Sequence, residues 1–260
     1  MNLTPITALD TPELALYRDL RGGAISGNLF VADSPKVVNL LLEDERIAIK
    51  SLLATPEYYH QNAELVDRRA IAACYAAPKP LMESIIGHTL HYNVMLCAEI
   101  PNETPIDRLG KSIVMFEGIS SSENIGAIAR SAAGLGVESL LLPAKGPHPY
   151  GRRAIRVSMG YASRLSFHRY GETIDTIKHL QQLGFVIIAA EIAPHSVPLG
   201  SFKTPEKWAL LLGHEGNGLS PEVQQACDAV VHIEMAAGVK SLNVAAAAGI
   251  MMYQFQRDCA

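Results

Sequence analysis

Residues 209–220 read Ala209-Leu-Leu-Leu212-Gly213-His-Glu215-Gly216-Asn-Gly218-Leu-Ser220, a short apolar run that passes directly into a turn. The run predicts a buried strand, and three glycines in the next six residues indicate a tight backbone path or a close approach to a ligand. Ser220 then caps a helix that begins with Pro221. The spacing fits neither the GxGxxG dinucleotide fingerprint nor the GxxxxGK(S/T) phosphate loop. A glycine-rich turn without a ligand is an equally good interpretation, although such a turn does not require the carboxylate of Glu215.

Strands of the same kind recur on both sides of this stretch. Near-continuous apolar runs separated by helices predict an α/β fold with a mostly parallel sheet covered on both faces. The expected strands are 112–116, 138–142, 165–168, 185–190, 209–212 and 230–234, with a helix from about 124 to 135. The last predicted helix, 241–256, is apolar or small nearly all round. It must therefore be buried on every side, either inside the domain or at an oligomer interface.

Two further segments carry polar groups that a plain α/β core does not need. After the strand 112–116, a polar loop enters a helix that we expect Asn124 to cap, and Arg130 lies farther along that helix. Near the other end, Ser241 begins the last helix, and Asn243 is a polar group in apolar surroundings that must find a partner. Both segments follow strands, where α/β sheets commonly bind ligands. A capping Asn124, a surface-paired Arg130 and a satisfied Asn243 are the structural alternatives.

Taken in order, these three segments resemble the signature motifs of the SpoU (TrmH-like) branch of the SPOUT methyltransferases. The matching pieces are Asn124-x-Gly126-x-x-x-Arg130, Leu212-Gly-His-Glu215-Gly-x-Gly218-Leu-Ser and Ile233-x-Met235…Ser241-Leu242-Asn243-Val. Each motif alone is a weak signal, but three in sequence are a strong one. The resemblance implies an RNA ribose 2′-O-methyltransferase that uses S-adenosylmethionine. It also implies a C-terminal domain folded with a trefoil knot and a homodimer formed through the last helix.

The resemblance extends to the residues of the site. By motif match, the catalytic residues would be Asn124, Arg130, Glu215, Ser241 and Asn243. The cofactor-binding residues would be Leu212, Gly213, Gly218, Ile233, Met235 and Leu242, mostly through backbone groups, and no metal is implied. Because a guanidinium is not deprotonated in proteins, Arg130 is better interpreted as an electrostatic activator of the 2′-hydroxyl than as a base. His214 and Ala245 depart from the family pattern beside the motifs.

The first hundred residues predict a separate, smaller α/β domain. The expected helices are 13–21, 35–42 and 80–86, and the expected strands are 29–32, 49–54, 70–75 and 94–98. A charged segment with two prolines predicts a linker at 101–110. The resemblance implies that 1–100 is a substrate-binding domain and 111–260 a methyltransferase domain. Phe30-Val-Ala-Asp33-Ser34-Pro-Lys-Val resembles the opening of the family's ribosomal-protein-like RNA-binding domain, with Asp33 and Ser34 in place of Glu and Gly.

Composition limits what can be expected of RNA binding. The net charge of −4 does not by itself favour binding to RNA phosphates, so RNA binding would need a local basic cluster. Arg152, Arg153 and Arg156, with Lys145 upstream, form the densest such cluster. The four cysteines are widely separated and are expected to be reduced, and neither a signal peptide nor a membrane-spanning run is evident. We therefore expect a soluble, cytoplasmic protein.

Three rival functions remain to be compared with methyl transfer. A catalytically silent RNA-binding relative is disfavoured by the intact motif residues. A Rossmann-type methyltransferase or dehydrogenase would carry its glycine-rich loop after the first strand of the unit, whereas here the glycines come late. A Ser/His hydrolase would need a GxSxG motif, which the sequence lacks. A two-domain build favours ribosomal RNA over transfer RNA as the substrate, and the modified nucleotide is not determined by the sequence.

Overall fold

The chain divides into two compact units in the computed structural model, which describes residues 2–9, 11–18, 25–69, 71–87 and 89–259. The first unit comprises Met1–Asn102 and Pro149–Ser163, and the second comprises Glu103–His148 and Arg164–Ala260. The first change of unit falls within the expected linker. Residues 149–163, however, are grouped with the first unit, although the sequence pattern placed them in the second domain. The expected limits at 1–100, 101–110 and 111–260 remain a prediction.

The second unit is built on a seven-stranded sheet whose neighbouring strands all run parallel. Across the sheet the order is β11-β13-β10-β12-β7-β8-β9. Along the chain the strands are β7 Ser112–Phe116, β8 Ser139–Pro143, β9 Ser166–Tyr170, β10 Val186–Ala190, β11 Val197–Pro198, β12 Trp208–Leu212 and β13 Ala229–His232. The expected α/β fold with a mostly parallel sheet is confirmed.

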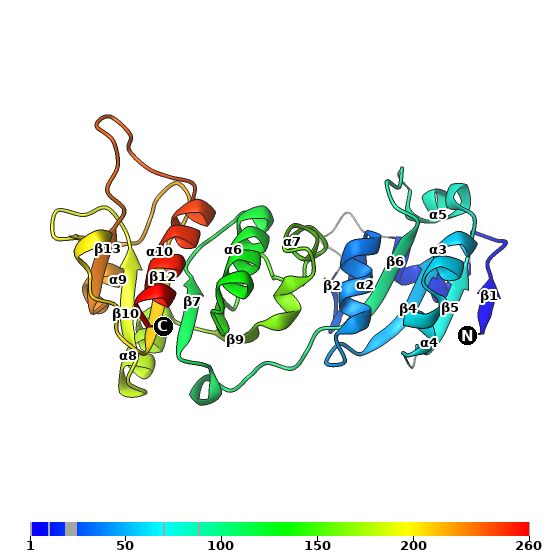
Figure 1. Cartoon of the computed structure of the whole chain (residues 1–260), viewed down its shortest axis with the longest axis horizontal. Helices are drawn as coiled ribbons and strands as arrows, with labels where there is room; N and C mark the ends of the chain where they lie inside the picture. The colour runs from blue at the N-terminus through cyan, green and yellow to red at the C-terminus, as the bar shows by residue number, and fades with distance from the viewer. Residues whose placement is uncertain (1, 10, 19–24, 70, 88, 260) are drawn as a thin grey trace. The chain divides into compact units, whose positions relative to one another are not determined.

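Helices cover both faces of this sheet. They are α6 Ser122–Leu135, α8 Thr173–Gln182, α9 Pro221–Ala226 and α10 Val244–Cys259, with 3-10 turns η2 Ile106–Arg108 and η4 Leu199–Ser201. Alternate strand residues such as Ile113 and Met115 pack in one core cluster with Ile177 of α8. On the other face α10 packs against α6, and Phe255 of α10 lies edge-on to Trp208 of β12 with ring centroids 5.2 Å apart (Figure 1). The apolar runs of the strands are thus buried on both sides, as their composition requires.

Both helices that carry predicted site residues begin at a different position than expected. Helix α6 begins at Ser122, and the residue that caps it is Ser121, whose hydroxyl accepts a hydrogen bond from the backbone N–H of Asn124 at 3.3 Å. Helix α10 begins at Val244 rather than Ser241. Its first free N–H groups are satisfied by Asn243, which therefore caps the helix instead of lying inside it. Several short polar residues near each helix start could act as the N-cap, and the sequence pattern does not identify which of them does so.

The last helix is not buried on every side within the chain. Its Ala248, Met251, Met252 and Phe255 are buried, but Ile250 is 43% exposed and Tyr253 is 56% exposed. The expectation of all-round burial inside the domain is therefore wrong, and one apolar strip of α10 faces outward. Among the described residues, no helix is both long enough and apolar enough to cross a bilayer.

The first unit contains a six-stranded mixed sheet of order β1-β5-β4-β6-β3-β2. Its strands are β1 Leu3–Pro5, β2 Ile25–Ser26, β3 Leu29–Asp33, β4 Ile49–Ala54, β5 Ala73–Ala76 and β6 Val94–Glu99. Its helices are η1 Pro12–Leu14, α1 Ala15–Arg18, α2 Pro35–Glu43, α3 Pro56–Gln61, α4 Ala63–Asp67, α5 Lys79–Ile86, α7 Arg152–Val157 and the turn η3 Tyr161–Arg164. Residues 19–21 of the expected first helix and residue 70 of an expected strand lie outside the described residues. Helices α3, α4 and α7 were not predicted, and α8 of the second unit was expected only as one of the helices that separate the strands.

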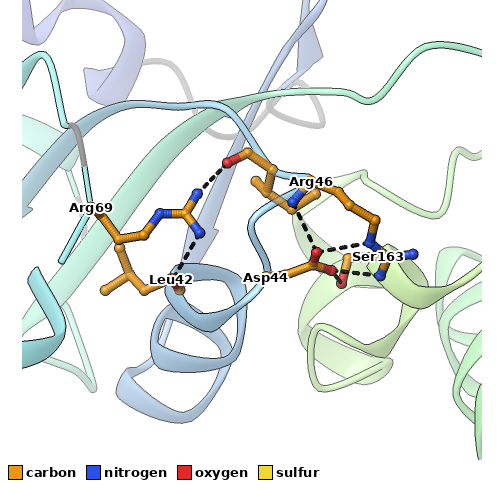
Figure 2. Close-up of polar contacts among 6 residues, drawn as sticks. Leu42, Asp44, Arg46, Arg69 and Ser163 are labelled. Atoms are coloured by element: carbon orange, nitrogen blue, oxygen red, sulfur yellow. Dashed lines mark hydrogen bonds and ion pairs between the residues drawn. The ribbon is translucent and has the colours of Figure 1, made fainter.

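Side-chain contacts explain why residues 149–163 belong to the first unit. The guanidinium of Arg152 donates two hydrogen bonds, of 2.9 and 2.7 Å, to one carboxylate oxygen of Asp33, which is 3% exposed. At the other end of the segment, the hydroxyl of Ser163 donates to Asp44 at 2.9 Å, beside Arg46 (Figure 2). Between them, α7 packs on β3. The segment is therefore held at both ends by carboxylates of the first unit.

Candidate active site

Four strand ends meet at one edge of the parallel sheet in the second unit. Phe116 of β7 pairs with Leu212 of β12, and Leu212 in turn pairs with Ala190 of β10. Ala190 also pairs with Val231 of β13. The loops that leave these carboxyl ends therefore start side by side, which is where open α/β sheets place their ligands. The three sequence motifs all follow strands of this group.

Glu215 is the residue that ties the first two motifs together. One carboxylate oxygen accepts hydrogen bonds from the backbone N–H of Ser121 at 3.1 Å and from the side-chain amide of Asn124 at 2.9 Å. The other accepts from the backbone N–H and the hydroxyl of Ser120, at 3.2 and 3.1 Å. Glu215 thus holds the loop after β7 and the first turn of α6 against the glycine-rich turn after β12.

These donors keep the Glu215 side chain ionised. Partial burial acts to raise the pKa of Glu215, but hydrogen bonds from the Asn124 amide and from the backbone N–H groups of Glu215, Ser120 and Ser121 outweigh it. The pKa falls to about 2. A carboxylate this weakly basic, with both oxygens already accepting hydrogen bonds, is suited to positioning rather than to proton transfer.

Asn243 connects the third motif to the other two. Its side-chain oxygen accepts hydrogen bonds from the backbone N–H of Ala245 at 2.8 Å and Ala246 at 3.4 Å, while its amide donates to the side-chain oxygen of Asn124 at 3.1 Å. Glu215, Asn124 and Asn243 therefore form one hydrogen-bonded chain. We call these three residues the polar cluster.

The glycine-rich turn is shaped by close backbone packing. A Cβ atom at Gly213 would lie 2.6 Å from the backbone carbon of Gly218 and 2.8 Å from the backbone nitrogen of Leu219, so only glycine fits. His214 stabilises the turn. Its Nδ1 accepts hydrogen bonds from the backbone N–H groups of Gly216, at 2.9 Å, and Asn217, at 3.3 Å. With Nδ1 acting as acceptor, the neutral imidazole carries its hydrogen on Nε2. His214 thus fixes the path of the turn.

A cavity of about 550 Å³ opens beside the turn, within the second unit. All six predicted cofactor-binding residues line it, namely Leu212, Gly213, Gly218, Ile233, Met235 and Leu242. Three predicted catalytic residues, Glu215, Ser241 and Asn243, line it too. Its size lies within the range of about 300–1,000 Å³ that is usual for small-molecule sites.

The other two predicted catalytic residues lie outside the cavity lining. Asn124 belongs to the polar cluster through its bonds to Glu215 and Asn243. Arg130 lies on the same helix, α6, with an exposed side chain. Within the part of the chain that the structure describes, no hydrogen bond or ion pair joins Arg130 to the polar cluster. The structure therefore brings four of the five together and leaves Arg130 apart.

The residues of the expected basic cluster belong to two different units. Arg152, Arg153 and Arg156 belong to the first unit, whereas Lys145 belongs to the second. The Arg152 side chain is only 17% exposed and is engaged by Asp33. Its charge stabilises the first unit and is not presented to a ligand. The charge of Arg152 is thus paired within the first unit, and RNA binding by the cluster stays a prediction.

Sequence reasoning missed several residues of the site. Ser120 and Ser121 hold the Glu215 carboxylate, and Glu191 and His232 line the cavity. Glu191 directly follows the buried strand β10. Glu215 was singled out as a carboxylate inside a glycine-rich turn, and Glu191 has no such turn around it; its position directly after an apolar run is the signal that could have found it.

Comparison with known proteins adds independent information. The model of the SpoU rRNA Methylase family matches residues 111–253. An uncharacterized tRNA/rRNA methyltransferase of Mycobacterium bovis is 32% identical to this chain, over 96% of this chain and 90% of its own. The 23S rRNA (guanosine-2′-O-)-methyltransferase RlmB of Acinetobacter baylyi is 25% identical, over 70% of this chain and 77% of its own. The crystal structure of an AdoMet-bound rRNA methyltransferase from Sinorhizobium meliloti has the same fold, with a TM-score of 0.84 at 23% identity over 98% of both chains.

Proposed function

We propose that this chain, which belongs to the SpoU rRNA Methylase family, transfers a methyl group from S-adenosylmethionine to a ribose 2′-hydroxyl of RNA. The chain is an RNA methyltransferase by family. The observation that carries the finer proposal is the cavity, because the third motif and the glycine-rich turn line it together and the polar cluster lies at its edge. Neither a catalytically silent RNA-binding protein nor a hydrolase requires the three motifs to meet at one cavity.

The cavity suits the cofactor in size and in lining. When bound, S-adenosylmethionine supplies a methyl group that is already activated by its sulfonium centre. The backbone groups of Gly213, Gly218, Ile233 and Leu242 would hold it, because glycines leave the main chain open to close approach. The protein's remaining task is to align and activate the nucleophile.

A ribose hydroxyl is a poor nucleophile, so the site must favour negative charge on its oxygen. Arg130 is the residue we assign to this task, as a permanent cation rather than as a base. The polar cluster supports Arg130 indirectly. Glu215 and Asn243 both hydrogen-bond to Asn124, which lies in the first turn of α6, the helix that carries Arg130. Ser241, in the cavity wall, would orient the cofactor or the ribose.

Three further properties belong to this proposal. Ribosomal RNA is favoured as the substrate, since a relative over 70% of this chain is named as a 23S rRNA methyltransferase. A homodimer through α10 is favoured by its exposed Ile250 and Tyr253. The C-terminal domain would carry the trefoil knot, the first unit would bind RNA, and the protein would act in the cytoplasm.

The proposal is tested by mapping 2′-O-methyl sites by mass spectrometry in RNA from a strain that lacks the gene. We expect one ribose site to lose its methyl group and to regain it when the wild-type chain is restored. Restoring Arg130→Ala should leave methylation reduced by at least about 100-fold, while calorimetry shows near-normal cofactor affinity. The activity is refuted when every ribose site keeps its methyl group in the deletion strain. Loss of cofactor binding in Arg130→Ala would refute only the role given to Arg130.

A further inference from the structure

Glu191 places a second carboxylate in the cavity, at the end of β10. One of its oxygens accepts the backbone N–H of Leu219 at 2.9 Å, and the other accepts its neighbour Ile192 N–H at 3.0 Å. Gly218 makes this approach possible, because a Cβ atom there would lie 2.1 Å from the Glu191 carboxylate. The half-buried side chain is thus held in one orientation against the glycine-rich turn.

This carboxylate has acceptor capacity left over. An ionised carboxylate offers about four acceptor positions, and the backbone occupies two of those on Glu191. Glu215 differs, since it already accepts four hydrogen bonds. The residues that line the cavity include no lysine or arginine, and no ion pair of Glu191 is present among the described residues. Its free positions therefore call for hydrogen-bond donors on the ligand.

The strand order separates the end of β10 from the end of β7. Strand β12 separates β10, which Glu191 follows, from β7, whose loop the polar cluster holds. Neighbouring strands are about 4.8 Å apart, so the two strand ends are separated by roughly 10 Å. A ligand whose reacting group faces the polar cluster therefore reaches Glu191 with a part that does not react.

We propose that Glu191 binds the ribose hydroxyls of the cofactor and so selects a ribonucleoside ligand. The inference rests on the proposed use of S-adenosylmethionine. A vicinal diol offers two adjacent donors to one carboxylate, an arrangement that acidic residues at strand ends also make in dinucleotide-binding folds. The amino-acid end of the cofactor is less suitable, because its own carboxylate would be brought close to that of Glu191.

The test measures binding, without turnover, by calorimetry. S-Adenosylhomocysteine, its 2′-deoxy analogue and an analogue that lacks the amino group are titrated into the wild-type chain, Glu191→Gln and Glu234→Gln. The last is the control, because it replaces an exposed glutamate outside the cavity lining. We expect the wild type and the control to bind the 2′-deoxy analogue about 10- to 100-fold more weakly than the parent compound. Glu191→Gln should bind the parent compound more weakly and should discriminate between the two ligands by less than about threefold.

Three other results would overturn the inference. If Glu191→Gln weakens both ligands equally, Glu191 only supports the turn. If Glu191→Gln instead loses discrimination against an analogue that lacks the amino group, the carboxylate binds the amino-acid end. If the wild-type chain binds neither ligand, the proposed function fails together with the inference, whereas the first two results leave that function standing. Melting of each variant without ligand verifies that it is folded.

Discussion

Glu215 combines exposure to solvent with a strongly held charge. Its two oxygens accept four hydrogen bonds from the loop after β7 and from α6. A neutral amide at this position would turn hydrogen atoms toward at least one of these donors. The negative charge of Glu215 therefore organises the site. Ionisation of this side chain should accordingly have a measurable effect on the free energy of unfolding.

The pKa of Glu215, about 2 in the folded chain, predicts how that effect changes with pH. The unfolded value is about 4.3, so a depressed folded pKa stabilises the protein fully above pH 4.3. This stabilisation is lost as the pH falls from about 4.3 to about 2. We expect the difference in free energy of unfolding between the wild type and Glu215→Gln to shrink over that window, as measured by denaturant titration. A difference that stays constant from pH 7 to pH 2 would contradict the assignment, and Glu234→Gln is the matched control.

At the scale of one element, the glycine-rich turn depends on an acceptor at position 214. His214 accepts the N–H of Gly216 two residues ahead, as the oxygen of an asparagine does in an Asx turn. An asparagine at position 214 should therefore replace histidine without loss. We predict that His214→Asn keeps the cofactor affinity within about twofold, whereas His214→Leu lowers it about 10-fold because two N–H groups lose their acceptor. Calorimetry measures both, and equal losses in the two variants would show that the acceptor is not what matters.

The outward strip of α10 supports a second prediction about an element. Tyr253 is 56% exposed and Ile250 is 43% exposed, whereas Met251, Met252 and Phe255 of the same helix are buried. In a dimer formed through α10, Tyr253→Glu would bury a charge and should convert the dimer to a monomer in light scattering at micromolar concentration. Tyr92→Glu, which changes a tyrosine 42% exposed outside this helix, should leave the dimer intact. A wild-type chain that is already monomeric would refute the dimer.

Elements that are buried on both sides were the most predictable. Strands β4 and β7 have the bounds expected from their apolar runs. Helix starts were less predictable, because several polar residues at 120–124 and 241–243 can cap and only the fold selects Ser121 and Asn243. In the candidate site, the motif residues were proposed from the sequence, whereas two of the bonds to Glu215 come from the backbone N–H groups of Ser120 and Ser121, which no side-chain pattern reveals.

At the scale of the whole molecule, the ion pair between Arg152 and Asp33 joins residues far apart in the sequence within the first unit. Asp33 is 3% exposed, so removing its partner leaves a buried charge uncompensated. We predict that Arg152→Met lowers the free energy of unfolding by about 3–5 kcal/mol, and that adding Asp33→Asn recovers at least half of the loss. Lys50→Met, which breaks an exposed pair with Glu99, should cost less than about 1 kcal/mol. Similar losses in Arg152→Met and Lys50→Met would contradict this account.

The sequence alone could not predict that residues 149–163 belong to the first unit. Residues 149–163 have the composition of a basic surface segment, and nothing in their order indicates that Asp33 and Asp44 hold them. The pairing depends on tertiary contacts between segments more than a hundred positions apart, which local periodicity does not record.

The first unit consists of two separate segments of the chain, so it cannot be removed or exchanged as one continuous piece. The chain passes from one unit to the other three times, after residues 102, 148 and 163. A fragment that stops near the linker would lack α7 and would expose the carboxylate of Asp33 without its cation. Exchanging the front modules of two such enzymes therefore requires the grafted piece to include its own equivalent of residues 149–163, or a matching partner for Asp33.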